Sequence, residues 1–477
     1  MTVIKSPKNK SRKITPFQAM MILVVVVCFY IFLQNMGDNF LYDYDAVAME
    51  FLQKEGYNIK TNKNDHSSNN NNDNNVVVVS SKEESSKQQQ NKNERIEVEN
   101  NNSKMTTTAL SSSLSSWPSP IEIMGENAIL KMEPILGKHR PDRDAIFSFA
   151  RGLTLDELNR FVGSLLHTGY DGDIVLAVEP KHDLSKEKLE YLEYHSQHSN
   201  VIVYSAELVC KRVLTKKRCK VFKMFLHKEI NGYLPDPRPH REVTQLRFEY
   251  YWAWSTLYSP TARIFLLDSR DLMFQLNPFT KVPSNIENKI MVFEESNLKQ
   301  ISDEPNNRLW LREGHQRKYV QKLGKHIPVS AGIILGGQAA IETFGRAMIY
   351  QWDTTQCKTY GCDQGHVNFL VHGNFLLNSS SSGEGGAIEE VTVEKFGESF
   401  VMSLGLQMKH GGGRNFLRKT KFVDETNTIL NQKGEISAIV HQFDQDKKLR
   451  SIFDGEKTTL FVKDWETIIK ASSKTTG

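Results

Sequence analysis

Two aspartates stand at the end of an apolar run in the middle of this 477-residue chain. The run Ile264–Leu267 is typical of a buried strand, and Asp268 and Asp271 follow it with Arg270 between them. Ligands of open α/β sheets bind beyond the carboxyl ends of the strands, and Mg²⁺ or Mn²⁺ is held by carboxylates together with substrate phosphates. The spacing therefore indicates a metal–diphosphate site. The alternative is that Asp268 caps a turn and Asp271 begins a helix.

Other polar residues follow apolar segments later in the chain. Glu295 comes after the predicted strand 289–293, Asp363 leads into a helix, and the predicted strand 436–440 ends in His441. Two carboxylates and one imidazole, with open positions for phosphate oxygens, suit Mn²⁺. Taken alone, His441 also fits a hydrogen-bonded, partly buried histidine.

These residues require a fold that brings distant parts of the chain to one edge of a sheet. From residue 121 onward, apolar residues alternate between strand and helix spacing, and a capping box of Thr154 and Glu157 begins the first long helix. The β-α-β-α-β order predicts an α/β fold with a mostly parallel, doubly wound sheet flanked by helices. The elements expected are strands at 145–150, 173–178, 201–204, 329–335 and 400–407, and helices at 186–195, 241–258 and 339–351.

The amino-terminal third differs from the rest in composition. Basic residues precede an apolar run and acidic residues follow it, so the positive-inside rule places the N-terminus in the cytosol. A cleaved signal peptide is the alternative. The expected segments are a cytosolic tail 1–16, a transmembrane signal anchor 17–34, a disordered Asn/Ser-rich stem 35–120 and a luminal domain 121–477. This is the layout of a single-pass type II membrane protein, and the short span suits the thin membranes of the early secretory pathway. Glycosylation sequons at Asn101 and Asn378 fall on the luminal side.

Cysteines and net charge limit the function classes. Cys210, Cys219, Cys357 and Cys362 fall in the expected luminal part, where disulfides persist. The local pairs 210–219 and 357–362 would each close a short loop, although spacing alone does not determine connectivity. A zinc site is the alternative, and neither pair has the spacing of a zinc knuckle. A formal net charge of +4 gives no case for nucleic acid.

Cationic residues also lie outside the central aspartate motif. Segment Cys210–Lys228 is rich in lysine and arginine, and we expect an irregular, solvated surface loop. The alternative is a basic lip that attracts an anionic acceptor or a donor phosphate. Arg247 lies beside the apolar stripe of the helix predicted at 241–258. It can reach a diphosphate from that position, or it can extend along the core face to solvent.

Five stretches together resemble the nucleotide-sugar glycosyltransferases of the GT-A fold. They cover about residues 140–450 in the order expected for that family. The stretches are Ser164–Ile174, Arg247-x-x-x-Tyr251-x-x-Trp254, Asp268-Ser269-Arg270-Asp271-x-x-Phe274-Gln275-x-x-Pro278-Phe279, Asp363-Gln364-Gly365-x-x-Asn368 and Val440-His441-Gln442-Phe443-Asp444.

The resemblance implies a Golgi enzyme that transfers a sugar from a nucleotide-diphosphate donor to a hydroxyl of a glycan, glycoprotein or glycolipid. It implies Mn²⁺ or Mg²⁺ held by a D-x-D motif and a late histidine. This chain departs from D-x-D, because Arg270 occupies the place of the second aspartate and the carboxylate moves to Asp271. The assigned roles are metal binding for Asp268, Asp271 and His441, substrate binding for Asp268, Arg270, Arg247 and Gln364, and catalysis for Asp363 and Glu295.

The stereochemistry of transfer stays open at this point. An inverting enzyme needs a carboxylate base for the acceptor hydroxyl, for which Asp363 and Glu295 are the candidates. A retaining enzyme does not need that base in the same place. Two other functions also remain: a non-catalytic carbohydrate-binding or scaffold protein on the same fold, and a nucleotidyltransferase.

Overall fold

The computed structural model describes residues 117–213, 216–229, 232–377, 388–411 and 414–475. The predicted cytosolic tail, signal anchor and nearly all of the stem lie outside these residues, as do both sequons. Within the described ranges, no helix is both long enough and apolar enough to cross a membrane. The layout of the amino-terminal third therefore stays a prediction.

A seven-stranded sheet in the order β13-β11-β12-β9-β2-β3-β4 forms the centre of the domain. Strand β12 runs antiparallel to both of its neighbours, and every other adjacent pair in the sheet is parallel. The predicted α/β fold is confirmed, and its sheet is mixed, with four parallel and two antiparallel pairs of adjacent strands. The strands are β2 (Ala145–Phe149), β3 (Asp173–Val178), β4 (Val201–Ser205), β9 (Arg263–Leu267), β11 (Lys289–Glu294), β12 (Val329–Gly337) and β13 (Glu390–Glu394).

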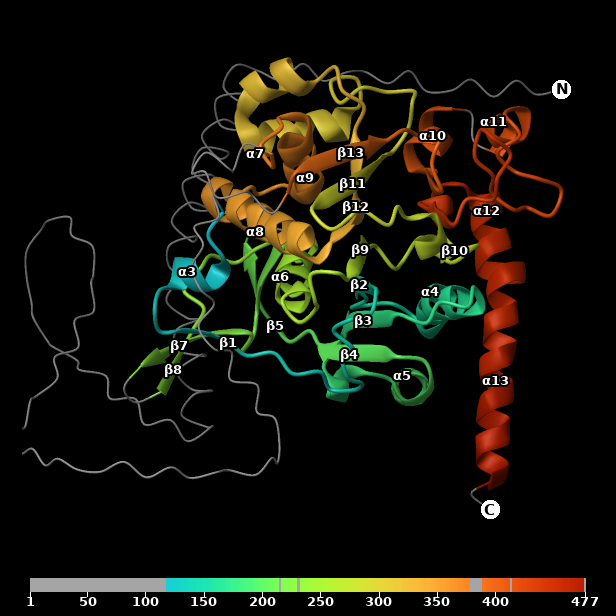
Figure 1. Ribbon diagram of the computed structural model, residues 1–477, viewed down its shortest axis with the longest axis horizontal. Coiled ribbons are helices and arrows are strands. Elements are labelled where there is room, and N and C mark those ends of the chain that lie inside the picture. Colours follow the sequence, from blue (N-terminus) through green and yellow to red (C-terminus); the bar gives the residue numbers. More distant parts are fainter. Residues whose placement is uncertain (1–116, 214–215, 230–231, 378–387, 412–413, 476–477) are drawn as a thin grey trace, which may run out of the picture. The chain divides into compact units, whose positions relative to one another are not determined.

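Helices bury both faces of this sheet, as Figure 1 shows. Side chains of a strand alternate between faces, so Val175 and Ala177 of β3 join one apolar cluster while Ile174 and Leu176 join the other. The first cluster lies under α6, α8 and α9, and the second under α4, α5 and α13. These helices are α4 (Leu155–His167), α5 (Lys186–His198), α6 (Val243–Ser255), α8 (Gln338–Thr355), α9 (Cys362–His372) and α13 (Thr458–Thr475).

The beginning of α4 confirms the predicted capping box. The Glu157 backbone N–H donates to the Thr154 hydroxyl (3.2 Å), and the Thr154 N–H donates to the Glu157 carboxylate (2.7 Å). Helix α7 (Pro305–Leu323), which packs against α9, was not predicted. Few of its positions are buried, Leu311 and Leu323 among them, so it carries no sustained apolar stripe.

A second, three-stranded sheet connects the carboxyl end of β9 to the last part of the chain. Strand β15 (Ile439–His441) pairs antiparallel with β10 (Leu272–Phe274) and parallel with β14 (Val401–Ser403). The strand predicted at 400–407 is therefore shorter than expected, because its partner β15 spans three residues and α10 (Gly405–His410) follows. Further short helices are α3 (Pro120–Met124), α11 (Arg414–Lys419) and α12 (Lys447–Ser451).

The basic segment after β4 is not an irregular loop, so that prediction was wrong. Strands β5 (Leu208–Val213) and β6 (Lys216–Val221) form an antiparallel hairpin, because Val209, Val213 and Val221 favour extended backbone and a disulfide joins Cys210 to Cys219. A second disulfide joins Cys357 to Cys362. Both predicted local pairings are confirmed. Strands β1 (Ala128–Leu130), β7 (Phe225–Glu229) and β8 (Gly232–Pro235) form a further small sheet.

Candidate functional site

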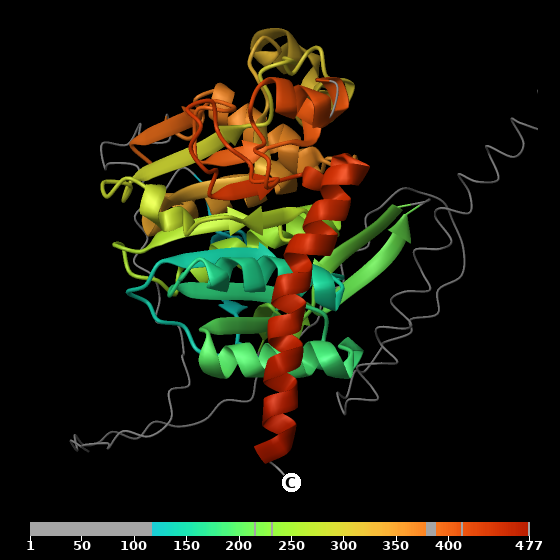
Figure 2. The ribbon, with the colours of Figure 1, turned by 90° about the vertical axis from the view of Figure 1, so that its right-hand side faces the viewer.

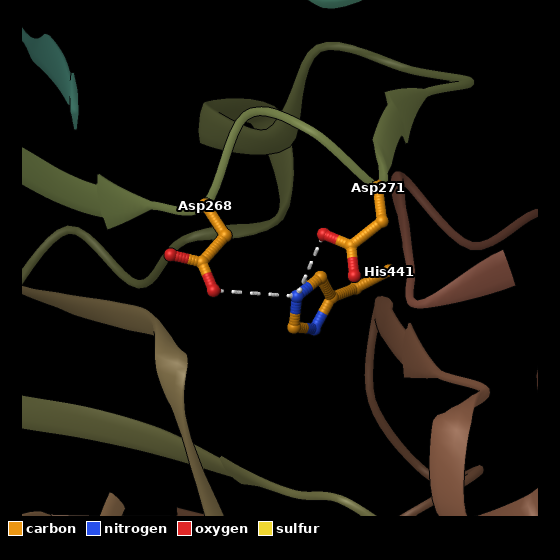
Figure 3. Close-up of side chains that lie close together, drawn as sticks. All are labelled: Asp268, Asp271 and His441. Carbon is orange, nitrogen blue, oxygen red and sulfur yellow. Dashed lines mark ion pairs between the residues drawn. The ribbon is translucent and has the colours of Figure 1, made fainter. Parts of the chain in front are cut away.

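Asp268, Asp271 and His441 meet at the carboxyl end of β9. Asp268 directly follows β9, Asp271 directly precedes β10, and His441 pairs in register with Leu272 of β10. The Nε2 atom of His441 lies 3.5 Å from the nearer Asp271 oxygen and 3.9 Å from an Asp268 oxygen, and Figure 3 shows the imidazole edge facing both carboxylates. One ligand atom from each residue fits within 4.8 Å of the others.

The environment of His441 would suit a metal ligand. The residue is 1% exposed, and its Nε2 has no hydrogen-bond partner among the residues that the structure describes. Its Nδ1 lies 3.3 Å from the Ser403 hydroxyl. In the tautomer with a proton on Nδ1, the ring donates to Ser403, and the lone pair of Nε2 is directed toward the carboxylates. A buried nitrogen without a partner beside two carboxylates fits a divalent cation.

Strand β12 contributes a glycine that leaves room for this cluster. The Asp268 N–H donates to the Gly332 carbonyl (2.8 Å) at the end of the β9–β12 pairing. A Cβ atom at Gly332 would lie 2.5 Å from an Asp268 carboxylate oxygen and 2.9 Å from Cε1 of His441. Any larger side chain here would therefore displace the carboxylate or the imidazole.

Arg247 joins Asp268 to Asp363 through ion pairs with both carboxylates. This residue of α6 is 7% exposed and makes ion pairs with both carboxylates, at 2.7 Å from Asp363, and it also donates to the Ala331 carbonyl (3.0 Å). Burial alone would lower the pKa of Arg247, but Asp268 and Asp363 raise it above its usual value. Burial raises the pKa of Asp363, and the cation opposes that shift. Arg247 thus holds Asp268 from the side away from His441.

Glu295 lies among polar side chains and is close enough to Asp268 to be influenced by its charge. Its buried carboxyl accepts a hydrogen bond from the Asn307 amide (3.5 Å) and a second one from the Gln442 side chain. Burial raises the pKa of Glu295 to about 8. The carboxyl is therefore mostly neutral at pH 7 and becomes a base stronger than an ordinary glutamate once it loses its proton.

Gln364 and Arg270, which were assigned to substrate binding, have surroundings that differ from those expected of such residues. Gln364 is buried in α9, where its amide accepts from the Ala331 N–H (2.7 Å) and donates to the Val329 carbonyl (2.7 Å). Arg270 points to solvent with a side chain that is 63% exposed, 4.0 Å from Glu157. Gln364 thus orders the start of β12, and Arg270 lies outside the three-residue cluster. Their roles toward a substrate stay predictions.

Several residues around the site carried no signal in the sequence. Ser403 and Asn307 belong to short or weakly patterned elements, and only the fold places them beside His441 and Glu295. Arg160 of α4 is buried and donates to the Arg270 carbonyl, and it pairs with Asp454 near the C-terminal helices. The site therefore draws on contacts between α4, the β9–β10 connection and the end of the chain.

Tyr360, by contrast, can be recognised from the sequence as a residue near the site. Tyr360 lies on the loop enclosed by the Cys357–Cys362 disulfide and is 65% exposed. The pKa of Tyr360 is raised, first by burial and then by the charges of Asp363 and Asp268. An aromatic residue between two closely spaced cysteines, just before an aspartate at a helix start, is visible in the sequence.

No protein-family model matches the sequence, and neither does any curated protein. Among solved structures, the chain is similar to the apo form of the glycosyltransferase GlyE of Streptococcus pneumoniae TIGR4, with 11% identity over 68% of this chain and a TM-score of 0.35. It spans 63% of the length of GlyE. It is also similar to the galactosyltransferase LgtC in complex with donor and acceptor sugar analogues, with 14% identity over 62% of this chain and 86% of LgtC and a TM-score of 0.32. Likeness at this level establishes no family, so the functional argument depends on the site.

Proposed function

We propose that this protein is a metal-dependent glycosyltransferase that moves a sugar from a nucleotide-diphosphate donor to a hydroxyl acceptor. The observation that carries the proposal is the group of Asp268, Asp271 and His441 at the carboxyl end of a strand, with a buried Nε2 that accepts and donates no hydrogen bond within the described part of the chain. Such a group suits Mn²⁺ or Mg²⁺, whose remaining positions accept phosphate oxygens. The sheet edge is also where α/β folds bind nucleotides.

The residues of the site have different roles in the proposed transfer. A divalent cation bound there would supply positive charge to balance the negative charge that develops on a leaving diphosphate. Asp268, Asp271 and His441 would hold the ion. Arg247 fixes the Asp268 carboxylate through an ion pair, so that less freedom is lost when the ion and donor bind.

Glu295 is the better supported candidate for the base that accepts the proton of the acceptor hydroxyl, if transfer inverts the sugar. Its raised pKa, near 8, makes its ionised form a stronger base. Asp363 is less suited, because one of its oxygens accepts from Arg247 at 2.7 Å and the cation lowers its basicity. We assign Asp363 the positioning of Arg247.

We also propose a single-pass type II membrane protein of the Golgi, with the domain on the luminal side. The apolar run 17–33, basic residues before it and acidic residues after it support this orientation. The two disulfides agree with an oxidising compartment.

The test is donor hydrolysis by the full-length chain over a panel of nucleotide sugars, with and without Mn²⁺. Asp271→Asn removes a charge without changing size and should lower kcat by at least about 10²-fold, as the loss of one transition-state stabiliser does. His441→Ala should weaken Mn²⁺ binding in calorimetry, and excess Mn²⁺ should partly restore its activity. Asp142→Asn, an exposed aspartate far from the motif in sequence, is the matched control.

Two results would overturn the proposal. One is wild-type turnover in Asp271→Asn, and the other is full activity in excess chelator. Tight binding of UDP with Mn²⁺, without hydrolysis or transfer for any donor, would instead indicate a non-catalytic binding protein.

A further inference from the structure

The β5–β6 hairpin carries the densest positive charge in the described part of the chain. Residues 208–221, which form the hairpin, contain six lysines and arginines and no aspartate or glutamate. In the same described region, no ion pair joins Lys211, Arg212, Lys217 or Arg218 to an acidic side chain, although Lys220 donates to the Asp236 carbonyl (2.8 Å). These cations are therefore not part of an internal ion-pair network.

The register places like charges directly opposite each other. Lys211 pairs with Arg218 and Arg212 pairs with Lys217 on consecutive rungs. Like charges in this arrangement destabilise a sheet. Because side chains alternate between faces, one cationic pair lies on each face of the ribbon. Arg212 and Lys217 are exposed to solvent.

A covalent link holds this unfavourable arrangement together. The Cys210–Cys219 disulfide lies on the rung next to the Lys211–Arg218 pair. It limits the separation of the strands that charge repulsion would promote. The Cys219 backbone is also paired with Arg241 in both directions, at 2.7 Å each. The like charges lower stability, and the disulfide and backbone hydrogen bonds hold them in place. This combination is expected of a binding surface.

The hairpin begins at the same edge of the sheet as the candidate site. Strand β5 starts three residues after the end of β4, and β4 runs in the same direction as β9, whose carboxyl end carries Asp268. Three strand spacings separate β4 from β9, which corresponds to about 14 Å. In Figure 2 strands β5 and β6, the pair of green arrows at the right, extend beyond the sheet.

The composition of the hairpin restricts the kind of polyanion that it suits. Residues 208–221 contain no Trp, Tyr or Phe. Bases of single-stranded nucleic acid stack on aromatic residues, and proteins at membrane interfaces use Trp and Tyr as anchors. A ribbon with cations on both faces can follow a flexible polymer, whereas a single small anion would contact one face. An acidic polysaccharide, with sulfate or carboxylate groups along its length, fits these features.

We propose that the β5–β6 hairpin binds an acidic polysaccharide and that this polymer is the acceptor of the sugar. The second part rests on the proposed glycosyltransferase function. The hairpin attracts the polymer at the edge of the sheet from which the aspartate motif also emerges.

The experiment compares two double variants of the full-length protein. Arg212→Gln/Lys217→Gln removes the exposed cationic pair, and Arg317→Gln/Lys322→Gln removes one arginine and one lysine that are exposed on α7. Affinity is measured for a sulfated heparin oligosaccharide, for neutral dextran and for vesicles that contain phosphatidylserine. An exposed ionic contact contributes up to about fivefold in affinity, so the loss of two contacts should weaken binding of the oligosaccharide by up to about 25-fold and by clearly more than in the α7 variant. The α7 variant should change by less than about twofold.

Thermal melting and donor hydrolysis distinguish a loss of polysaccharide binding from a loss of folding or of catalytic activity. The hairpin variant should melt at or above the wild-type temperature, because it loses a like-charge pair. Its donor hydrolysis should stay unchanged. Equal losses of affinity in both variants would overturn the proposal, since they would indicate a general charge effect. Binding to the vesicles but not to the oligosaccharide would assign the hairpin to a membrane surface instead. Failure of donor hydrolysis in the wild type would refute the proposed function and leave the binding result standing.

Discussion

Replacement of Arg247 by glutamine tests whether the site is held by a buried charge network. The wild-type guanidinium donates to two carboxylates and to the Ala331 carbonyl. Asp363 is buried, whereas the Asp268 side chain is 37% exposed and can recover hydration. The main cost of Arg247→Gln should therefore come from the uncompensated charge of Asp363.

The magnitude depends on pH because Asp363 can escape the cost by binding a proton. Removal of one partner from a buried ion pair costs about 3–5 kcal/mol. Loss of Arg247 raises the pKa of Asp363 further above its unfolded value. Stability gained through a raised pKa is present below the unfolded pKa and is lost as pH rises through the folded pKa. At pH 5 the loss of stability in Arg247→Gln should approach that of lost hydrogen bonds, about 1–2 kcal/mol. At pH 8 the loss should reach about 3–5 kcal/mol.

Urea unfolding of Arg247→Gln, Asp363→Asn and the double variant, at pH 5 and pH 8, measures these differences. At pH 8 the double variant should be more stable than the sum of the two single changes predicts, by about 2 kcal/mol, since residues in contact couple. Arg263→Gln is the matched control, because Arg263 pairs with Asp144 at the other end of β9 in a partly exposed position. Its cost should stay near 1 kcal/mol. The reasoning is refuted if Arg247→Gln costs no more than the control at pH 8, or if its cost is independent of pH.

Two further changes test the neighbouring parts of the site. Burial raises the pKa of Glu295 to about 8, so the stability that its neutral form contributes is complete below its unfolded pKa and is lost as pH rises toward 8. Glu295→Gln should therefore gain stability relative to the wild type as pH rises from 5 to 8, by at most about 4 kcal/mol at about 1.4 kcal/mol per pH unit. The exposed Glu126→Gln should show no such gain, and parallel pH curves of the two variants in urea unfolding would contradict this reasoning. Gly332→Ala should lower Mn²⁺ affinity by at least about tenfold in calorimetry, because its Cβ would lie 2.5 Å from an Asp268 oxygen; unchanged affinity would show that this carboxylate does not hold the ion.

Much of the fold and part of the site follow from local patterns in the sequence. Short, nearly continuous apolar runs predict the parallel strands, because strands of such sheets are buried on both faces. The capping box at Thr154 predicts the start of α4, since side-chain and backbone groups three residues apart satisfy each other. The aspartates after Leu267 lie at the sheet edge because a strand that ends in a buried sheet places its next residues there. Both disulfides join cysteines that are close in the chain.

Contacts between distant segments depended on the tertiary structure. The register of β10 with β15 places His441 opposite Leu272 and hence beside Asp271, and three-residue strands have no pattern that announces such a pairing. The partners of Arg247 come from β9 and α9, so nothing local to α6 separates a cation that binds carboxylates from one that reaches solvent. The raised pKa of Glu295 arises from burial, which is a property of the packed domain. The hairpin after β4 was not predicted, because the cross-strand pairs and the disulfide that stabilise it form only when the two halves of the segment meet. Sequence determines which groups are available and where elements begin, whereas the distances and desolvation that give those groups their chemistry exist only once the chain has folded.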